Sequence, residues 1–309
     1  MSDRGAVAIT GANGYVGTTL CAAFAASGYR VVALQRSAPC GATDYVPYSL
    51  EDGPAAPLPG DVVAVVHCAY DLRARDPAEI ERVNLGGTRR LLRAVGDVPL
   101  VLISSLSAYA GTRQIYGSVK LACEELVAAR GGTSLRVGLV YGGTDRGMIG
   151  SLRKVAALPI VPMPRPDSHQ FPVYAEDMAR CVVAATEQPP PHRILGVANP
   201  RPVPFSEIMR ILRASVTAEP LRTVPVPSAL IYRALRAAER TGVRKGFRAD
   251  SLLGLMHPAP GVPHVGHWAG RGIALRDFAH EARRDRVREP EGDNDSRRGA
   301  GTVRADGPT

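Results

Sequence analysis

The sequence predicts an α/β protein, built on a doubly wound parallel β-sheet with a smaller C-terminal lobe. Three observations predict this fold class. Through the first two hundred residues, short apolar runs alternate with segments whose apolar residues recur at helical spacing. The runs carry valine, isoleucine and leucine on both faces, as strands do when helices cover both sides of a parallel sheet. The glycine-rich stretch TGANGYVG follows the first run and opens a helix.

The expected elements follow in chain order. Repeated strand–helix–strand units predict a doubly wound sheet. The apolar runs predicted to be strands are residues 7–10, 30–34, 62–67, 100–104, 135–140 and 194–197. The helical periodicity between them covers residues 16–27, 78–95, 118–130 and 176–187. Beyond Pro200 the pattern changes, and proline-rich connectors alternate with short helices expected at residues 206–215 and 228–241.

Length and composition favour a globular, cytoplasmic protein. The chain has 309 residues, of which 45% are hydrophobic and 22% are charged, and this length allows a large buried core. The longest apolar stretch, around residues 62–66, is far shorter than the roughly 18 residues that a membrane helix needs. The first residues lack the hydrophobic region of a signal peptide. We therefore expect no membrane association.

Cysteines and charge narrow the functional classes. Five scattered cysteines without a C-x-x-C spacing predict neither a disulfide framework nor a metal site. The net charge of +9 is spread along the chain without a basic run interleaved with aromatic residues, so we expect no nucleic-acid partner. A basic balance also suits an enzyme that handles phosphate-bearing cofactors. Residues 281–309 contain seven arginines, seven acidic residues and no aromatic side chain, and are predicted to be a disordered tail.

The glycine-rich stretch predicts a dinucleotide site. Gly11, Gly14 and Gly17 permit a tight turn in which backbone N–H groups and a helix N-terminus face a pyrophosphate. An ordinary strand–helix turn can carry the same glycines. The position of this loop after the first strand favours the dinucleotide.

The chain is predicted to divide into two parts. Residues 1–146 and 173–199 are interpreted as a Rossmann-type dinucleotide-binding domain. Residues 147–172 and 200–280 are interpreted as the substrate-binding lobe. A small-molecule substrate is expected in the cleft between them.

The end of the second strand distinguishes NAD from NADP. An acidic side chain there accepts hydrogen bonds from the adenine ribose, whereas an arginine pairs with a 2'-phosphate. The stretch VVALQRS places Gln35 and Arg36 at this point. We therefore expect NADP(H) in preference to NAD(H). The alternative for Arg36 is a solvated surface arginine.

Tyr116 and Lys120 form a candidate catalytic pair. Positions four apart lie on one face of a helix, about 6 Å from each other. A phenol normally loses its proton near pH 10, and a cation about 4 Å away shifts its pKa by roughly three units toward neutrality. Only three of the 38 basic residues are lysines, and a compact ammonium suits this role better than a guanidinium. We expect Tyr116 to act as general acid/base; the alternative is a surface helix on which the two residues are simply neighbours.

Serines follow the fourth predicted strand. The stretch LVLISSLSAYAG brings Ser104, Ser105 and Ser107 to the carboxyl edge of the sheet. A hydroxyl at this edge can donate to a substrate carbonyl oxygen while Tyr116 supplies the proton. The alternative is that these serines only form a turn.

Four stretches in this order, TGANGYVG, SSLSAYAG, YGSVK and RVGLVYG, resemble the short-chain dehydrogenase/reductase superfamily in its extended, epimerase/dehydratase-like branch. The stretches VVHCAY, VNLGGTRRLL, VYAEDMA and VANP are also similar to that branch. The resemblance spans residues 6 to about 280 and is specific for the superfamily, not for the substrate. It implies a homodimer formed through a helix pair that includes residues 118–130.

The resemblance also implies roles for individual residues. It makes Ser105 the carbonyl-binding hydroxyl, with Ser107 as the alternative, Tyr116 the general acid/base and Lys120 its ribose-binding activator. Asn84 is similar to a helix asparagine of the family, and a buried packing amide is the alternative. The residues expected to contact the cofactor are Gly11, Asn13, Gly14, Tyr15, Val16, Gly17, Gln35, Arg36, Cys68, Ala69, Tyr116 and Lys120.

The chain departs from the sugar-nucleotide enzymes of this branch. Leu139 stands where they usually have an asparagine, Gln170 where they have an arginine, and Tyr174 where a histidine is common. Ser49 replaces an acidic residue near the adenine, and the loop from the catalytic serine to the tyrosine is short. The loss of an amide and a guanidinium removes hydrogen-bonding partners for a nucleotide sugar.

These observations together predict an NADP(H)-dependent oxidoreductase. It would be a ketoreductase or dehydrogenase of a small or medium carbonyl or alcohol substrate. The alternatives are a nucleotide-sugar epimerase or dehydratase, and a cofactor-sensing regulator without chemistry of its own.

Overall fold

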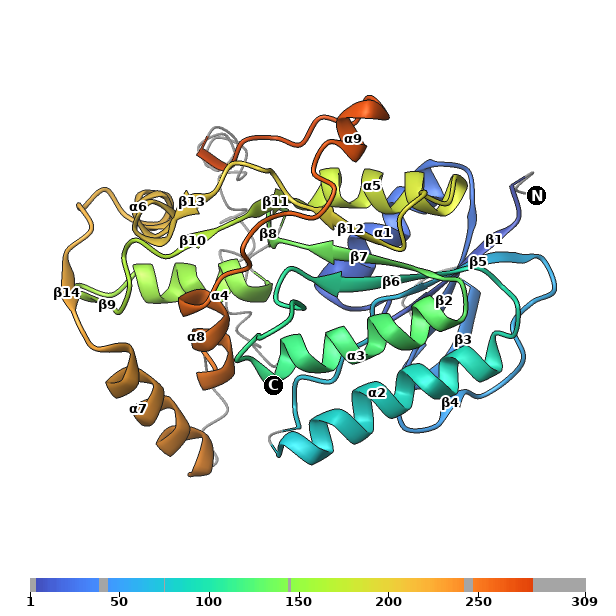
Figure 1. The fold of residues 1–309 in the computed structure, drawn as a ribbon, viewed down its shortest axis with the longest axis horizontal. Coiled ribbons are helices and arrows are strands. Elements are labelled where there is room, and N and C mark those ends of the chain that lie inside the picture. Colours follow the sequence, from blue (N-terminus) through green and yellow to red (C-terminus); the bar gives the residue numbers. More distant parts are fainter. Residues whose placement is uncertain (1–3, 39–43, 75, 144–145, 242–246, 280–309) are drawn as a thin grey trace, which may run out of the picture.

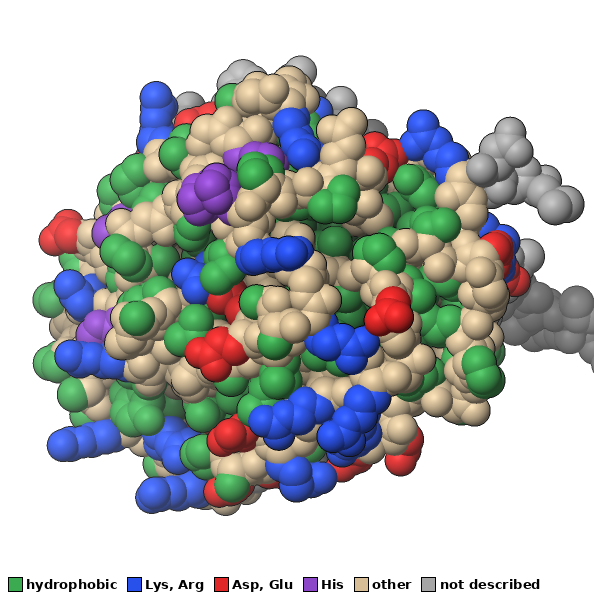
Figure 2. All heavy atoms as spheres, turned by 45° about the vertical axis from the view of Figure 1, so that its right-hand side comes forward, with side chains coloured by type: hydrophobic (Ala, Val, Ile, Leu, Met, Phe, Trp, Pro, Cys, Tyr) green, Lys and Arg blue, Asp and Glu red, His purple; other side chains and the backbone are tan. Residues whose placement is uncertain are grey.

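The computed structural model describes residues 4–38, 44–74, 76–143, 146–241 and 247–279 of the chain (Figure 1). The predicted tail at residues 281–309 lies outside them. No helix in the described ranges is both long and apolar enough to span a membrane. Figure 2 shows lysine and arginine side chains spread over one face, with acidic side chains between many of them.

An eight-stranded sheet forms the centre of the molecule, in the order β12-β7-β6-β5-β1-β2-β3-β4. All neighbouring strands are parallel except the pair β3 and β4. The strand order reverses between β1 and β5, which confirms the predicted doubly wound α/β fold and places a crevice at the carboxyl ends of these strands. The strands are β1 (Ala6–Thr10), β2 (Arg30–Gln35), β3 (Asp44–Ser49), β4 (Gly53–Pro54), β5 (Val62–His67), β6 (Leu100–Ser105), β7 (Thr133–Val137) and β12 (Ile194–Val197).

Helices cover both faces of this sheet (Figure 1). Helices α1 (Tyr15–Ala26) and α5 (Ala175–Glu187) pack together on one face, where Phe24 and Met178 are fully buried. Helices α2 (Pro77–Ala94) and α3 (Ile115–Ala129) pack on the other face. Burial of apolar side chains on both sides explains why the central strands β1, β5 and β6 are mostly apolar.

The remaining elements surround a third group of buried side chains, which includes Phe205, Ile208, Leu252 and Phe278. Three small sheets pair β8 with β11, β10 with β13, and β9 with β14. The predicted boundaries of a separate lobe stay a prediction. These elements are β8 (Leu139–Tyr141), α4 (Gly147–Ala156), β9 (Val161–Met163), β10 (His169–Gln170), β11 (Pro172–Tyr174), β13 (Val203–Pro204), α6 (Phe205–Val216), β14 (Thr223–Pro225), α7 (Ser228–Arg240), α8 (Ala249–Met256) and α9 (His267–Gly270).

The strand expected at residues 135–140 is two strands, β7 and β8, separated at Gly138. The chain changes neighbours there: the Gly138 amide donates to Val197 in β12, and the Leu139 amide donates to Phe171 beside β11. A Cβ at position 138 would lie 2.0 Å from the Phe171 oxygen, so only glycine fits. This switch turns β8 away from the main sheet and brings Leu139 to the crevice.

Candidate active site

The glycine loop joins β1 to α1 and has the geometry of a phosphate cradle. Gly11 adopts a φ of +66°, and the Gly14 amide donates to its carbonyl oxygen at 2.9 Å. A Cβ on Gly17 would lie 2.1 Å from the same oxygen, so a side chain there would force the loop and helix apart. The N-terminal residues of α1, Tyr15, Val16 and Gly17, line the crevice, where a helix N-terminus favours an anion.

Thr10 fastens the carboxyl ends of β1 and β5. Its Oγ1 accepts hydrogen bonds from the backbone amides of Cys68 and Ala69, both at 3.1 Å, and lies 2.7 Å from His67 Nδ1. A hydroxyl that accepts twice has one proton left to donate, so His67 accepts at Nδ1 and carries its proton on Nε2, 3.1 Å from Thr88 Oγ1. Burial, aided by the charge of Lys120, lowers the pKa of His67 to about 3 and keeps the ring neutral.

A cavity of about 620 Å³ extends from the glycine loop toward the ends of β2 and β3. Gln35 is buried and donates to the Ser37 carbonyl at 2.9 Å, whereas the Arg36 side chain is exposed at the cavity edge. Ser49 also lines this cavity and donates to Asp52 at 2.7 Å, so an acidic group is present near the position where Ser49 replaces one. The predicted cofactor residues that line it are Gly11, Asn13, Gly14, Gln35, Arg36, Cys68 and Ala69.

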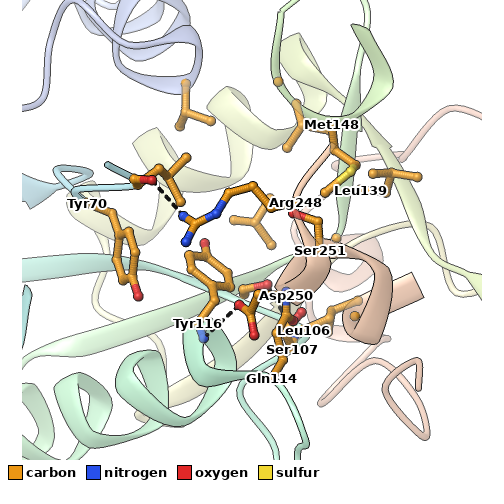
Figure 3. A pocket seen from close by; sticks show the side chains of 18 of the residues that line it. Tyr70, Leu106, Ser107, Gln114, Tyr116, Leu139, Met148, Arg248, Asp250 and Ser251 are labelled. Atoms are coloured by element: carbon orange, nitrogen blue, oxygen red, sulfur yellow. Dashed lines mark hydrogen bonds between the residues drawn. The ribbon is translucent and has the colours of Figure 1, made fainter. Parts of the chain in front are cut away.

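A second cavity, of about 440 Å³, opens on the other side of the glycine loop (Figure 3). Ser105 and Tyr116 line it together with Gly11, Gly14, Tyr15, Val16, Gly17 and Cys68. The two cavities share Gly11, Gly14, Cys68, Tyr70 and Asp71, and so they meet at the loop. We call them the adenosine cavity and the substrate cavity. Their junction lies at a cradle that a Cβ would fill, and the two cavities together fit an extended dinucleotide.

Tyr116 lies in the first turn of α3, which begins at Ile115, three residues before the predicted start. Its ring packs edge-on against that of Tyr70, with centroids 4.7 Å apart. The Lys120 ammonium is buried behind both rings, 6.0 Å from the centroid of Tyr116, and donates to the Ile103 carbonyl at 2.7 Å. Lys120 is not among the residues that line either cavity.

The expectation that Lys120 shifts the phenol toward neutrality is wrong for this arrangement. Burial raises the pKa of Tyr116 to about 12, and a hydrogen bond with Ser105 opposes that rise only in part. Burial also lowers the pKa of the Lys120 ammonium. Loss of water disfavours both charged forms, and the ammonium donates to a backbone carbonyl instead of the phenol. The phenol is therefore fully protonated at neutral pH.

The three serines have different surroundings. Ser104 points away from the crevice and donates to the buried Glu124 carboxylate at 2.5 Å, so it has a packing role. Ser105 and Ser107 both line the substrate cavity, and the Ser107 amide donates to Ser105 Oγ at 3.1 Å. The hydrogen bond between Ser105 and Tyr116 favours Ser105 over Ser107 as the partner of the phenol.

Asn84 holds the loop that follows β5. Its Oδ1 accepts from the Asp71 amide at 2.7 Å, and its Nδ2 donates to the Ile80 carbonyl at 2.9 Å. The side chain is 2% exposed, so it acts from within the structure on a segment that borders both cavities.

Side chains from the C-terminal part complete the substrate cavity, and sequence reasoning missed them. Asp250 in α8 accepts hydrogen bonds from the backbone amides of Ile115 and Tyr116 (Figure 3). Arg248, just before α8, donates to the Leu72 carbonyl at 2.6 Å. Both residues are distant from Tyr116 in the chain, and no local pattern marks them.

Two comparisons with known sequences bear on this site. Residues 7–197 match the model described as the NAD dependent epimerase/dehydratase family. A relative from Caulobacter vibrioides (strain NA1000 / CB15N), named ceramide reductase, is 30% identical over 249 residues, which cover 75% of this chain and 77% of the relative.

Solved structures share the fold. UDP-glucose 4-epimerase from Thermus thermophilus, in complex with NAD, superposes with a TM-score of 0.65 at 19% identity and covers 91% of this chain and 98% of its own. MoeE5 in complex with UDP-glucose and NAD gives a TM-score of 0.66 at 21% identity, over 92% of this chain and 98% of its own. At these identities the likeness concerns the fold alone.

Proposed function

The chain belongs to the NAD dependent epimerase/dehydratase family, and from this premise we propose that it is an NADP(H)-dependent ketoreductase or dehydrogenase. The resemblance to the extended branch of short-chain dehydrogenases/reductases is confirmed by that match and by the fold of its structural neighbours. One observation carries the proposal: among the described residues, Ser105 and Tyr116 line the same cavity as the glycine loop.

The residues divide the chemistry among them. The nicotinamide cofactor, when bound along the glycine loop, supplies the hydride chemistry. Ser105 donates a hydrogen bond to the substrate carbonyl oxygen and holds it beside the phenol. Tyr116 gives its proton to that oxygen in reduction and takes it back in alcohol oxidation. Lys120, whose ammonium donates to the Ile103 carbonyl, packs beside the Tyr116 ring, and water from the crevice restores the phenol proton.

The raised pKa of Tyr116 supports the reductive direction. A phenol with a pKa of about 12 keeps its proton at neutral pH and is ready to donate it. An alkoxide is a stronger base than a phenolate, so the transfer to a reduced carbonyl is downhill. The oxidative direction needs the phenolate, which is scarce at neutral pH.

Arg36 supports NADP(H) over NAD(H). It is exposed at the edge of the adenosine cavity, at the end of β2, and Gln35 beside it is buried. An exposed guanidinium at this point suits a 2'-phosphate.

The walls of the substrate cavity favour a reductase over a sugar-nucleotide enzyme. Leu139 and Gln170 line the cavity, and Gln170 donates its amide to the Leu255 carbonyl at 3.1 Å. Neither position offers the free amide or guanidinium that would bind a nucleotide sugar. The relative named ceramide reductase also supports a reductive activity on a ligand that is mostly apolar.

A nucleotide-sugar epimerase or dehydratase is the second candidate, because the matching family model carries that description. Such an enzyme uses its cofactor within each turnover and consumes none. The two candidates therefore differ in net NADPH consumption.

The test is to mix the purified protein with NADPH and a panel of ketones and aldehydes, and to follow NADPH loss. Steady consumption, with alcohol as product, is expected. Uridine- and thymidine-diphosphate sugars are screened in parallel for a rise in melting temperature, since a bound ligand stabilises the native state. No consumption with any carbonyl, together with stabilisation and conversion of a nucleotide sugar, would overturn the proposal.

A further inference from the structure

The substrate cavity has mostly apolar walls, which come from segments far apart in the sequence. Around the polar pair Ser105 and Tyr116, its lining includes Leu72, Ile80, Leu106, Leu139, Met148, Phe171, Leu255, Pro258 and Ala259. A volume of about 440 Å³ with such walls gains stability from a ligand that brings an apolar chain.

The charged side chains that line the cavity form their hydrogen bonds and ion pairs with other groups of the protein. The Asp250 carboxylate accepts from two backbone amides of α3. The Arg248 guanidinium donates to the carbonyls of Leu72 and Ala74. The Asp71 carboxylate pairs with Arg73. These groups hold the cavity in shape and have few hydrogen bonds left for a polar ligand.

Among the described side chains of the lining, two buried polar atoms have no hydrogen-bond partner: Tyr70 Oη and Gln114 Oε1. Tyr70 also lines the adenosine cavity and so faces the cofactor side. Gln114 lines the substrate cavity but not the adenosine cavity, and the residue is 8% exposed. A buried amide without a partner costs free energy, and a ligand group that pairs with it recovers that cost.

Gln114 borders the same cavity as Ser105 and Tyr116. It precedes Tyr116 by two residues and forms the N-cap position of α3, where its side chain makes no capping hydrogen bond. Gly254 in α8 leaves the space that the amide occupies, because a Cβ there would lie 2.7 Å from Gln114 Oε1 and 2.9 Å from Nε2. In Figure 3 the Gln114 side chain is drawn among the residues lining the cavity, below Asp250.

We infer that the substrate is a carbonyl compound with a long apolar chain and one hydroxyl or amide group beside the carbonyl, and that Gln114 binds this group. The inference rests on the proposed function and specifies its substrate class. The apolar walls hold the chain, Ser105 and Tyr116 hold the carbonyl oxygen, and the Gln114 amide distinguishes substrates that carry the neighbouring polar group from those that lack it.

The test compares four ketones with the holoenzyme and NADPH: dodecan-2-one, 1-hydroxydodecan-2-one, 1-acetamidododecan-2-one and 1-hydroxybutan-2-one. The wild type is expected to prefer the hydroxy or the acetamido ketone over dodecan-2-one by roughly tenfold or more in kcat/KM. It is also expected to prefer the long hydroxy ketone over the short one by roughly threefold per added methylene until the cavity is filled. The acetamido arm decides whether a hydroxyl or an amide fits better.

Gln114→Leu is expected to reduce the preference for the polar group to near unity while the chain-length preference stays. The matched control is Gln170→Leu, which replaces a glutamine of the same cavity whose amide already binds Leu255; its preference ratio should match the wild type. If Gln114→Leu does not fold, Gly254→Ala displaces the same amide without removing it and should lower the ratio as well.

The outcomes separate the two proposals. Equal kcat/KM for dodecan-2-one and both of its polar relatives, or an unchanged ratio in Gln114→Leu, would overturn the role of Gln114. Equal use of the long and short hydroxy ketones would overturn the apolar chain. In both cases the reductase assignment would stand, whereas reduction of none of the four ketones or of the wider panel would overturn the proposed function and this inference with it.

Discussion

The carboxylate of Asp250 holds the backbone of Tyr116. Its Oδ2 accepts a hydrogen bond from the Tyr116 amide at 3.2 Å, and its Oδ1 accepts one from the neighbouring Ile115 at 2.9 Å. Asp250 lies in α8, and Arg248 just before it binds the loop after β5 through the Leu72 carbonyl. One short segment of the C-terminal part therefore positions both the helix of the phenol and the loop beside the cofactor cradle.

Replacing Asp250 with alanine removes two acceptors from the first turn of α3. We expect kcat to fall about tenfold with little change in KM, because the phenol loses its fixed position, and the free energy of unfolding to fall by about 1–2 kcal/mol. Steady-state kinetics and urea unfolding measure the two effects. The matched control is Asp76→Ala, which removes the cap of α2, where Asp76 accepts from the Glu79 amide. A loss of kcat in the Asp76 variant as large as that in the Asp250 variant would show that the effect comes from stability alone.

Tyr116→Phe is expected to lower turnover by roughly 10² to 10⁴ while NADPH binding stays close to that of the wild type. The pH dependence should differ between directions. With a pKa of about 12 the phenol is protonated throughout the neutral range, so reduction should be independent of this group. Oxidation of the alcohol needs the phenolate and should rise about tenfold for each pH unit below that pKa. Rates for both directions between about pH 6 and about pH 9 test this, and an oxidation rate that levels off near neutrality would show a much lower pKa.

The serines make a second, graded test. Ser105→Ala should lower kcat by roughly 10² to 10³, the cost of one hydrogen-bond donor to the reacting oxygen. Ser107→Ala, at the same cavity, is its control and should change kcat much less. Ser104→Ala removes one of the two donors to Oε1 of the buried Glu124, the other being Arg136 Nε, and should lower the free energy of unfolding by about 1–3 kcal/mol without a comparable effect on kcat. A larger fall of kcat in Ser107→Ala than in Ser105→Ala would make Ser107 the carbonyl-binding hydroxyl in place of Ser105.

The lowered pKa of the buried His67 ring predicts how the free energy of unfolding depends on pH. Its pKa is lowered from 6.5 to about 3 by burial, so the unfolded chain binds a proton in that interval that the native protein does not. Stability is therefore full above about pH 6.5 and falls as the pH drops toward 3. Between about pH 7 and about pH 5 this one group should cost about 2 kcal/mol of unfolding free energy.

Urea unfolding of His67→Gln at the same two pH values checks this prediction. The variant is less stable at neutral pH, because it loses the hydrogen bonds to Thr10 and Thr88. The difference between the two pH values should shrink by the amount assigned to the histidine. The same change at the exposed His192 is the control. An unchanged difference in the His67 variant would mean that the ring is already protonated in the native state near pH 5.

The sheet and the cofactor cradle could be predicted because their signals are local. A strand buried on both faces needs a short apolar run, and the turn after β1 needs glycine at positions 11 and 17, where a side chain meets backbone. β3 could not be predicted in this way: its residues alternate between exposed and buried positions beside the two-residue edge strand β4, so it has no continuous apolar run. The break at Gly138 is set by Phe171, a contact that the local pattern does not contain.

The candidate site could be predicted only in part. The spacing of Tyr116 and Lys120 shows that they share a face of a helix, but the depth of that face decides their pKa values, and burial outweighs the nearby charge. Asp250 lies 134 residues beyond Tyr116 and sits in the first turn of a helix, where a carboxylate is common for local reasons. Only the folded chain reveals that it caps a different helix.

Arg36→Ala tests the choice between the two nicotinamide cofactors. The side chain is exposed at the adenosine cavity, so its loss should leave the melting temperature unchanged. A guanidinium that binds a 2'-phosphate is worth about 1.5–3 kcal/mol, and KM for NADPH should therefore rise roughly 10- to 100-fold while KM for NADH stays nearly the same. Arg73→Ala is the control, since this guanidinium lines the same cavity but binds Asp71. An equal rise of KM for NADPH and for NADH in the Arg36 variant, or a wild type that prefers NADH, would show that Arg36 is a solvated surface arginine that does not bind the 2'-phosphate.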